Sequence, residues 1–398
     1  MLYFTKNKSD CTGCSCCVSS CPINCISMIQ DEEGFLYPVA SDKCIKCGKC
    51  ENICPVNNFT KGTKTTFIQT AYCAISKNKS LWKQSTSGGA FSEICKAFGN
   101  SDTIVCGAAW DGYNVHHICV DGVDKISPLC KSKYIASSLD NTFFKIKQYL
   151  ERGKKAIFCG TPCQVAGLKN YIGKDCDNLL LIDLICHGVG SPYVFKACLE
   201  EMENQFNCSI EMYEFRAKRK FYETDYLSRI NTDKGVEKYF LNDQYNQLFL
   251  KQNCLRPSCG EHCRYRNEQR QGDITIADFK NLTEVFPDLI GTKWNYSSIV
   301  VNTAKGNKIM EKLKETMEVR ECKIDYIKKH NPLFYRQTWF SKDRDRFFKE
   351  FISSPNEAIR KWTSPAIISK ISFKRRIYDM LPVFMRRIIL KRMRKRTP

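Results

Sequence analysis

The chain has 398 residues, of which 43% are hydrophobic, and its 62 Lys and Arg against 42 Asp and Glu give a formal net charge of +20. A chain of this length exceeds one hydrophobic core and predicts two or three domains. It lacks both the roughly 18 consecutive apolar residues of a membrane span and the apolar segment of a secretory signal, so we expect a cytoplasmic location.

Cysteine is unusually frequent. The chain contains 25 cysteines, an odd number that cannot all be paired. A reducing cytoplasm disfavours structural disulfides, so ligation of metal by thiolates is the better interpretation. A [4Fe–4S] cluster held by four thiolates carries a charge of about −2, so bound clusters would lower the positive charge of the folded protein.

Residues 1–60 contain two copies of one cysteine run. The first is Cys11-x2-Cys14-x2-Cys17-x3-Cys21-Pro22 and the second is Cys44-x2-Cys47-x2-Cys50-x3-Cys54-Pro55. In this bacterial ferredoxin spacing, three close thiolates reach three irons of one cubane and the fourth binds the other cluster. The sequence therefore predicts a ferredoxin-like α+β module with two [4Fe–4S] clusters. One is held by Cys11, Cys14, Cys17 and Cys54, and the other by Cys44, Cys47, Cys50 and Cys21.

Zinc is the alternative metal for such a module. Zinc also takes four thiolates, but zinc sites do not normally need two copies of a run that ends in Cys-Pro. Cys16 and Cys25 lie outside the pattern, and we expect them to pack as small apolar residues. The polar segment Thr60–Lys64 is typical of a linker to the next domain.

Strands alternate with helices between residues 65 and 330, which predicts an α/β domain. Apolar and β-branched runs predict the strands, and apolar periodicity predicts the helices. The expected strands are 67–76, 103–110, 115–120, 155–159, 179–186, 210–216, 274–278 and 297–301, and the expected helices are 91–98, 141–151, 163–171, 192–206 and 308–317. Residues 331–398 are aromatic and basic, and we expect a tail of loosely packed helices there.

Further cysteines lie where predicted strands begin or end. Cys159 and Cys163 follow one strand, Cys186 ends the next, and the run Cys254-x4-Cys259-x3-Cys263 precedes a third. Ligands gather at the carboxyl ends of strands in an open α/β sheet. The spacing therefore suggests a third metal site, with buried thiols that bind nothing as the alternative.

Six motifs resemble the coenzyme F420 hydrogenase/dehydrogenase beta-subunit family. They are STSGGAF (85–91), SKYIASSL (132–139), CGTPCQVAGL (159–168), DLICHGVGSP (183–192), CLRPSCGEHCRY (254–265) and GDITIADF (272–279). The resemblance implies a domain that binds FAD and a [4Fe–4S] cluster, behind a ferredoxin module that many members carry. Relatives also occur in bacterial polysaccharide gene neighbourhoods, which implies a role in polysaccharide biosynthesis.

The resemblance also implies a ligand set for the third cluster. By motif, Cys163, Cys186, Cys259 and Cys263 match cluster ligands. The last two cysteines are commonly separated by two residues in the family, whereas three intervene here. Cys254, Cys159 and His262 therefore stay open as alternatives for the fourth ligand.

Two segments are candidates for the flavin. Ser87, Gly88 and Gly89 precede a predicted helix, where glycine lets backbone amides approach a phosphate or a flavin edge, although ordinary turns use the same residues. Lys133 and Tyr134 lie in the second matching segment and would supply a cation and an aromatic ring. A solvated loop pair is the alternative for these two.

The expected function is an iron–sulfur, flavin-dependent oxidoreductase. Electrons would move between the ferredoxin-type clusters and FAD, which converts one-electron steps into two-electron chemistry. The partner would be a redox protein or a small acceptor, either coenzyme F420-like or another two-electron substrate. One rival is a non-catalytic electron-carrier subunit docked to a separate enzyme. A second rival, nucleic-acid binding, lacks any recognised reading motif.

The C-terminal tail is strongly basic. Residues 365–398 hold eleven Lys and Arg and one acid, Asp379. Apolar and paired basic residues recur there at near-helical spacing, as in helices that lie on anionic membranes. Such a helix would place the protein peripherally at the inner membrane face. A solvated helix and a docking site for an acidic partner remain alternatives.

Overall fold

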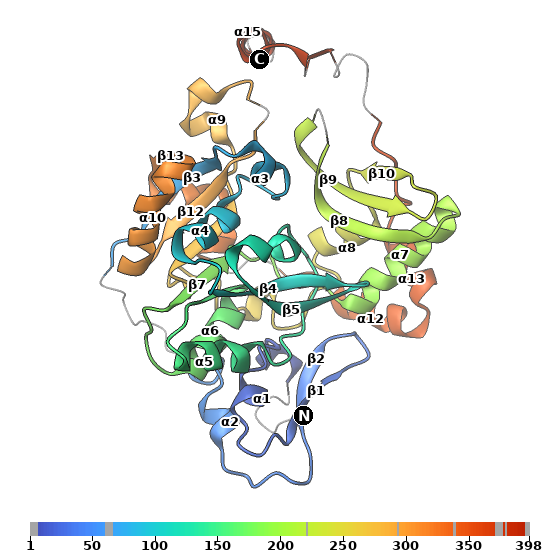
Figure 1. The fold of residues 1–398 in the computed structure, drawn as a ribbon. Helices are drawn as coiled ribbons and strands as arrows, with labels where there is room; N and C mark the ends of the chain where they lie inside the picture. Colours follow the sequence, from blue (N-terminus) through green and yellow to red (C-terminus); the bar gives the residue numbers. More distant parts are fainter. Residues whose placement is uncertain are drawn as a thin grey trace.

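The computed structural model describes residues 7–59, 67–219, 222–292, 294–336, 340–370, 377–378 and 380–394, without the side chains of 222–226, 262 and 391–394. The expected linker Thr60–Lys64 and the basic residues 374–376 lie outside these ranges. Within them the fold is α/β, with a small α+β module at its N-terminus, as the sequence predicts (Figure 1).

The N-terminal module is one antiparallel strand pair with two short helices. Its elements are η2 (Lys8–Asp10), α1 (Cys16–Ser20), β1 (Ile26–Gln30), β2 (Leu36–Ala40) and α2 (Lys49–Asn52). Each of the two α-helices begins inside a cysteine run, after a residue with positive φ: 57° at Ser15 and 70° at Gly48. This left-handed residue turns the chain sharply between successive cysteines of each run.

The second unit is built on an eight-stranded sheet in the order β13-β3-β12-β11-β7-β6-β4-β5. The strands are β3 (Thr70–Ser76), β4 (Ile104–Asp111), β5 (Asn114–Asp121), β6 (Ala156–Gly160), β7 (Leu179–Leu184), β11 (Ile274–Asp278), β12 (Ser297–Val301) and β13 (Met317–Cys322). The four strands β11, β7, β6 and β4 run parallel to one another. Their carboxyl ends therefore lie at one edge, where the loops after β6 and β7 meet.

Helices cover both faces of this sheet. They are α4 (Ala90–Phe98) and α10 (Ala304–Thr316) on one face, and α5 (Thr142–Glu151) and α6 (Pro162–Ile172) on the other. Alternate residues of β6 and β7 point to opposite faces: Ile157 and Leu180 pack with α4 and α10, while Phe158 and Leu181 pack with α5 and α6. Burial on both faces explains the continuous apolar runs of these strands.

A smaller sheet lies beside the large one. It comprises β8 (Ile210–Arg219), β9 (Tyr222–Thr232) and β10 (Glu237–Phe240), and it packs with α7 (Pro192–Phe206), α8 (Gln244–Leu250), α12 (Arg344–Ser353) and α13 (Pro355–Trp362). The expectation of loosely packed helices after residue 330 is wrong for α12 and α13. Phe347, Phe348 and Ile359 are at most 2% exposed and join one core with Phe195 and Phe240, so these aromatic residues serve the core.

The remaining elements are short apart from the last. They are α3 (Lys79–Lys83), η3 (Val123–Lys125), η4 (Ser127–Leu129), η5 (Gly260–His262), α9 (Leu282–Val285), η6 (Pro287–Leu289), α11 (Ile324–His330), η7 (Pro332–Phe334) and α15 (Val383–Arg394). No helix among the described residues is long and apolar enough to cross a bilayer.

The N-terminal module is packed firmly against the rest of the molecule. Phe35 and Tyr37 belong to the core that contains α7, α8 and α12, and Cys16 belongs to the core under α5 and α6. The Arg344 guanidinium also donates to the buried Glu33 carboxylate at 2.5 Å. The N-terminal module, the large sheet and α12 therefore share buried side chains.

One disulfide was not anticipated from the sequence. Cys106 on β4 and Cys119 on β5 are bonded, with their Cα atoms 4.2 Å apart. The two residues face each other in the antiparallel register, and directly opposite pairs bring their side chains close. The pairing thus follows from a strand register that the cysteine spacing did not reveal.

Candidate metal centres

The first predicted quartet of cysteines is gathered around one small space. Cys11, Cys14, Cys17 and Cys54 all line a cavity of about 20 Å³. Burial and the neighbouring Cys11 and Cys54 raise the pKa of Cys14 to about 12. These thiols therefore become thiolates when a metal displaces their protons. Cys54 reaches this group from the second run, as the ferredoxin spacing predicts.

The second quartet lies closer to solvent. Cys47 is exposed, while Cys21, Cys44 and Cys50 are half-buried. Burial raises the pKa of Cys50, and Cys44 and Cys47 add to this shift. Cys25 belongs to this neighbourhood as well, because its Sγ lies 3.4 Å from Cys21 Sγ. Cys16, in contrast, is fully buried, and its thiol donates to the Ile53 carbonyl at 3.6 Å.

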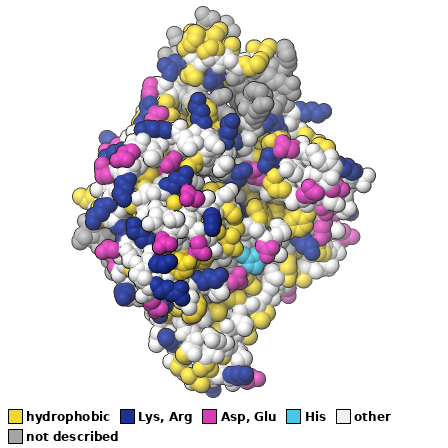
Figure 2. Space-filling view, viewed as in Figure 1, with side chains coloured by type: hydrophobic (Ala, Val, Ile, Leu, Met, Phe, Trp, Pro, Cys, Tyr) yellow, Lys and Arg dark blue, Asp and Glu magenta, His cyan; other side chains and the backbone are white. Residues whose placement is uncertain are grey.

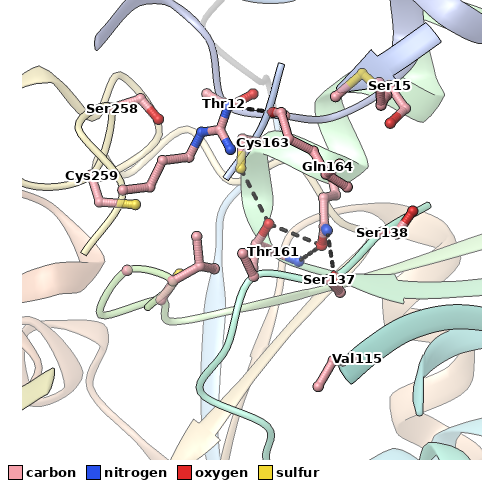
Figure 3. A pocket seen from close by; sticks show the side chains of 18 of the residues that line it. Thr12, Ser15, Val115, Ser137, Ser138, Thr161, Cys163, Gln164, Ser258 and Cys259 are labelled. Atoms are coloured by element: carbon pink, nitrogen blue, oxygen red, sulfur yellow. Dashed lines mark hydrogen bonds between the residues drawn. The ribbon is translucent and has the colours of Figure 1, made fainter. Parts of the chain in front are cut away.

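The four cysteines matched by family motif share a larger cavity between the N-terminal module and the large sheet. Its volume is about 590 Å³, and Cys163, Cys186, Cys259 and Cys263 are all in its wall. Figure 3 shows Cys163 and Cys259 in this wall. Burial raises the pKa of Cys163 to about 12, and Cys263 and Cys259 add to the shift. Burial and the same neighbours, together with Cys163, raise the pKa of Cys186.

Sheet topology explains how these cysteines meet. Cys163 lies in the first turn of α6, directly after β6, and Cys186 follows the neighbouring parallel strand β7. The start of α6 is fixed locally: the Gln164 side-chain oxygen accepts from Thr161 N at 2.9 Å, and its amide donates to Ser137 Oγ at 3.0 Å (Figure 3). Cys259 and Cys263 flank η5 and line the same cavity.

Two of the alternatives for the fourth ligand lie elsewhere. Neither Cys159 nor Cys254 lines the 590 Å³ cavity. Burial raises the pKa of Cys159 to about 12, and Asp183 adds to this shift while Lys133 opposes it. Cys254 is fully buried in the core of the smaller sheet, and the side chain of His262 lies outside the described residues. The geometry thus favours Cys263 as the fourth member.

The described residues contain no group of three His, Cys, Asp or Glu side chains arranged to hold a single metal ion. A site for a single metal ion requires its ligand atoms to converge on one point. The four thiolates of a cubane bind four different irons, so their sulfurs stand farther apart.

The cavity wall is basic. The guanidinium groups of Arg256, Arg266 and Arg270 are in this wall and at most 6% exposed. Arg270 is 3.2 Å from the Asp183 carboxylate, and Arg266 donates to the His187 carbonyl. Buried cations beside four thiols suit a cluster with a net charge of about −2, so the donor set fits a [4Fe–4S] group.

The first quartet and the third are neighbours. A Cβ on Gly167 of α6 would lie 3.1 Å from Cys14 Sγ, so the helix that carries Cys163 touches the ferredoxin run. The Tyr265 hydroxyl donates to the Pro55 carbonyl at 2.8 Å. Burial raises the pKa of Tyr265, and thiols of both quartets, Cys163 and Cys14 among them, strengthen the effect.

The flavin candidates Ser87, Gly88 and Gly89 lie outside this cavity. A Cβ on Gly88 would approach the Ala74 carbonyl to 2.3 Å, so glycine is required there for packing between β3 and β12. Gly89 has a φ of 91° and is the N-cap residue before α4. The Ser87 hydroxyl donates to the Tyr296 carbonyl at 2.6 Å. Packing therefore accounts for the motif without a ligand.

The second flavin candidate segment adjoins the first. Ser132 N donates to the Thr86 hydroxyl at 2.9 Å, which joins the two segments. The Lys133 ammonium donates to the Cys130 carbonyl at 2.7 Å, and burial lowers its pKa to about 8. The Tyr134 ring stacks on Phe249 with centroids 5.0 Å apart.

Sequence reasoning missed two cations at this place. Arg216 on β8 donates to the Tyr134 hydroxyl at 3.2 Å and pairs with Asp278 at 2.7 Å. Lys218 donates to the Ser87 carbonyl at 2.6 Å. No local pattern marks either residue, because Arg216 follows Tyr134 by 82 residues and Lys218 follows Ser87 by 131 residues, so they meet only in the folded chain.

Comparison with known proteins bears on both units. Residues 153–326 match the C-terminal part of the family described as coenzyme F420 hydrogenase/dehydrogenase, beta subunit, and residues 10–65 match the 4Fe-4S dicluster domain. The first range contains Cys163, Cys186, Cys259 and Cys263, and the second contains both ferredoxin runs. The matched families thus cover all the predicted cysteine ligands.

Individual relatives were also found. Ferredoxin 7Fe of Hydrogenibacillus schlegelii is 44% identical over 57 residues, which are 14% of this chain and 68% of that protein. Among solved structures, a chain of the F420-reducing [NiFe] hydrogenase complex from Methanosarcina barkeri aligns with a TM-score of 0.43 and 16% identity. The alignment covers 73% of this chain and 90% of that one.

Proposed function

We propose that this chain, which belongs to the coenzyme F420 hydrogenase/dehydrogenase beta-subunit family and carries a 4Fe–4S dicluster domain, passes electrons along three [4Fe–4S] clusters in series. The chain is an iron–sulfur electron-transfer protein of an oxidoreductase family. Burial supports the order of the series. A cluster held by the second quartet, with exposed Cys47, would meet an external redox protein. The first quartet, in which Cys11 and Cys14 are buried, would hold the cluster that lies between it and the third.

The observation that carries this proposal is the contact between α6 and the ferredoxin module. Cys163 and Gly167 lie one turn apart on α6, and Gly167 approaches Cys14 Sγ. Ligands proposed for two different clusters are thereby separated by one helical turn and one van der Waals contact. The surrounding buried cations would stabilise the reduced form of these clusters, because reduction adds negative charge.

We propose that FAD binds where the segments at Thr86 and Ser132 adjoin. Tyr134 supplies an aromatic face there, and Arg216 and Lys218 supply positive charge of the kind that a pyrophosphate needs. When bound, FAD exchanges single electrons with the third cluster and two electrons with a substrate. Arg216 is oriented by its ion pair with Asp278, so it presents a fixed cation at this edge.

Flavin analysis tests this part of the proposal. Anaerobically purified protein should release FAD on denaturation, and Arg216→Met should lower its flavin content while its iron content is unchanged. Lys308→Met on the exposed side of α10 is the matched control and should retain both. Equal flavin content in the Arg216→Met and Lys308→Met proteins would contradict an FAD site at Arg216.

Turnover separates an enzyme from a carrier. A flavin-loaded chain that alone reduces a small two-electron acceptor, coenzyme F420 or a simple quinone, acts as an oxidoreductase. A chain with full clusters but neither flavin nor turnover acts as the electron-carrier subunit of a separate enzyme. We propose the first of these two functions, because the cations at Tyr134 have no role in the transfer between clusters.

We also propose that α15 contacts an anionic membrane surface. Phe384 is 64% exposed and Ile388 is 49% exposed, and Figure 2 shows hydrophobic side chains at the top of the molecule, where Figure 1 places α15. The Arg387 guanidinium instead donates to the Ile290 carbonyl and holds the helix to the protein body. Apolar contact would thus combine with the other basic residues of the tail.

Co-sedimentation tests the membrane contact. We expect binding to vesicles that contain anionic lipid at low salt, weaker binding at high salt, and loss of binding on deletion of residues 372–398. Phe384→Ser should weaken binding without a change in charge. Binding that survives the deletion, or no binding at low salt, would contradict the proposal and leave a solvated helix or a dock for an acidic partner.

A further inference from the structure

An arginine from the loop of the third quartet reaches into the ferredoxin module. Arg256 lies three residues before Cys259 in the sequence and is 2% exposed. Its Nε donates to the Cys11 carbonyl at 2.8 Å, and its Nη2 donates to the Leu36 carbonyl at 2.9 Å. One side chain therefore connects the loop that precedes Cys259 with the first cysteine run and with β2.

The ferredoxin loop is shaped around this guanidinium. Gly13 has a φ of +71°, and a Cβ at this position would lie 3.0 Å from Arg256 Nη1. The rings of Tyr37 and Phe35 lie with their centroids 4.2 Å and 5.6 Å from the guanidinium carbon. A space that glycine leaves open and two aromatic rings are both suited to a buried cation.

Among the residues that the structure describes, no carboxylate forms an ion pair with Arg256. Two other buried arginines, Arg270 and Arg344, have Asp183 and Glu33 as ion-pair partners. Across the described ranges, no Asp or Glu lies within ion-pair distance of Arg256, whose guanidinium donates to two backbone carbonyls. A buried charge without an opposite charge is costly, so this position calls for a negative group that the described carboxylates do not provide.

We propose that Arg256 is the shared electrostatic partner of the first and the third cluster and sets the reduction potentials of both. The guanidinium donates to the Cys11 carbonyl of the first quartet, and Arg256 lies in the wall of the cavity that the third quartet lines. Each [4Fe–4S] cluster with four thiolates carries about −2 and gains one more negative charge when it accepts an electron. A fixed positive charge between them stabilises the reduced form of each. This inference rests on the proposed function, because it concerns residues around two of the proposed clusters.

The second quartet provides an internal reference. Cys21, Cys44, Cys47 and Cys50 lie toward solvent, and none of them lines the cavity whose wall includes Arg256. Removal of the charge should therefore act on two clusters of three. Arg256 acts through its charge and its position and does not itself exchange electrons, so the appropriate readout is a potential measured for each cluster.

The experiment is a redox titration of the full chain, followed by electron paramagnetic resonance, for wild type, Arg256→Met and Arg256→Lys, with iron quantified in each. We expect Arg256→Met to shift two midpoint potentials to more negative values and leave the third unchanged. Arg256→Lys, which keeps the charge, should restore most of the shift. No shift in any cluster, or an equal shift in all three, would overturn the inference.

A loss of iron is also informative. If Arg256→Met loses one cubane, Arg256→Lys decides: full iron with near wild-type potentials supports the electrostatic role, and the same loss of iron in both variants contradicts it. Failure of the proposed function is distinguishable, because wild type would then lack three clusters. If wild type holds three clusters and their midpoint potentials do not change in Arg256→Met, this inference is overturned while the proposed function stands.

Discussion

Cys14 Sγ lies against Gly167 of α6, so closely that a Cβ at position 167 would come within 3.1 Å of the sulfur. Cys163 lies one turn earlier on the same helix. A helix of the large unit therefore carries a proposed ligand of the third cluster and contacts a proposed ligand of the first. Glycine is the residue that permits this approach.

Gly167→Val should separate the two units. The added methyl groups meet Cys14 and the ring of Phe143, and overpacking of this kind costs about 1–3 kcal/mol. We expect a lower denaturant midpoint and, in stopped-flow reduction, a third cluster whose reduction lags behind that of the first. Lys169→Val, on the exposed side of α6, is the matched control. Identical kinetics in the two variants would argue against transfer through this contact.

Alanine substitutions test the third ligand set. Cys163→Ala and Cys259→Ala should each lower iron by about four atoms per chain, because a cubane rarely survives the loss of a thiolate. Cys254→Ala and Cys159→Ala are the controls, since neither residue lines the cavity. Iron and acid-labile sulfide are measured in all four. A comparable loss of iron in a control would show that the substituted cysteine of that control is a ligand.

The ion pair between Glu33 and Arg344 should matter for stability. Arg344 is 3% exposed, and Glu33→Gln would leave its charge with only the exposed carboxylate of Asp345, 3.4 Å away. Removal of one partner of a buried pair costs about 3–5 kcal/mol. Arg346→Gln, at a residue whose side chain is 65% exposed and pairs with Glu350, should cost under about 1 kcal/mol. Chemical denaturation under anaerobic conditions measures both. Equal effects would mean that the buried pair is not a structural link.

His117 predicts a dependence of stability on pH. The ring is 4% exposed, and burial lowers its pKa to about 4 from an ordinary 6.5. Between these values the unfolded chain binds more protons than the folded one, so stability falls as pH decreases through that window. We expect a loss of roughly 1 kcal/mol between pH 7.5 and 5.5 from this residue.

His117→Gln should reduce that slope. Burial also lowers the pKa of His187 to about 4, so the variant should retain a part of the dependence. Denaturant unfolding at the two pH values measures the effect. An unchanged slope in the variant would show that His117 titrates alike in the folded and unfolded states.

Much of the candidate site follows from sequence because its determinants are local. Ferredoxin spacing assigns Cys54 to the group of Cys11, and the structure brings these two thiols to one cavity. Strand ends are equally local: Cys163 and Cys186 follow apolar runs that form β6 and β7. The strands 274–278 and 297–301 and the helix 192–206 were predicted with the ends observed.

What sequence analysis missed depends on distant contacts. Arg256 lies three residues before the predicted ligand Cys259, but only the fold shows that Gly13 and Tyr37 surround it. The sequence predicted loosely packed helices around the aromatic residues of α12, because their packing partners, such as Phe195, lie some 150 residues earlier in the chain. The linker predicted at Thr60–Lys64 suggested independent modules, whereas Phe35 is buried in a core shared with α12.

The shared core changes the expectation for a truncated chain. Domain boundaries near residues 60 and 330 remain a proposal, but removal of residues 1–59 would uncover Arg256, Arg344 and the surface that receives Phe35. The truncated chain should be less soluble and less stable than the full one. If the truncated chain is as stable as the full chain, the two modules are independent folding units.

The most direct test of three clusters in series is the cofactor content of anaerobically purified protein. The account predicts about twelve irons and about twelve acid-labile sulfides per chain, with three distinct [4Fe–4S] signals on reduction. About eight irons per chain, with no further loss in Cys163→Ala, would contradict the third cluster and the proposed electron path through α6. Zinc in place of iron would contradict electron transfer altogether.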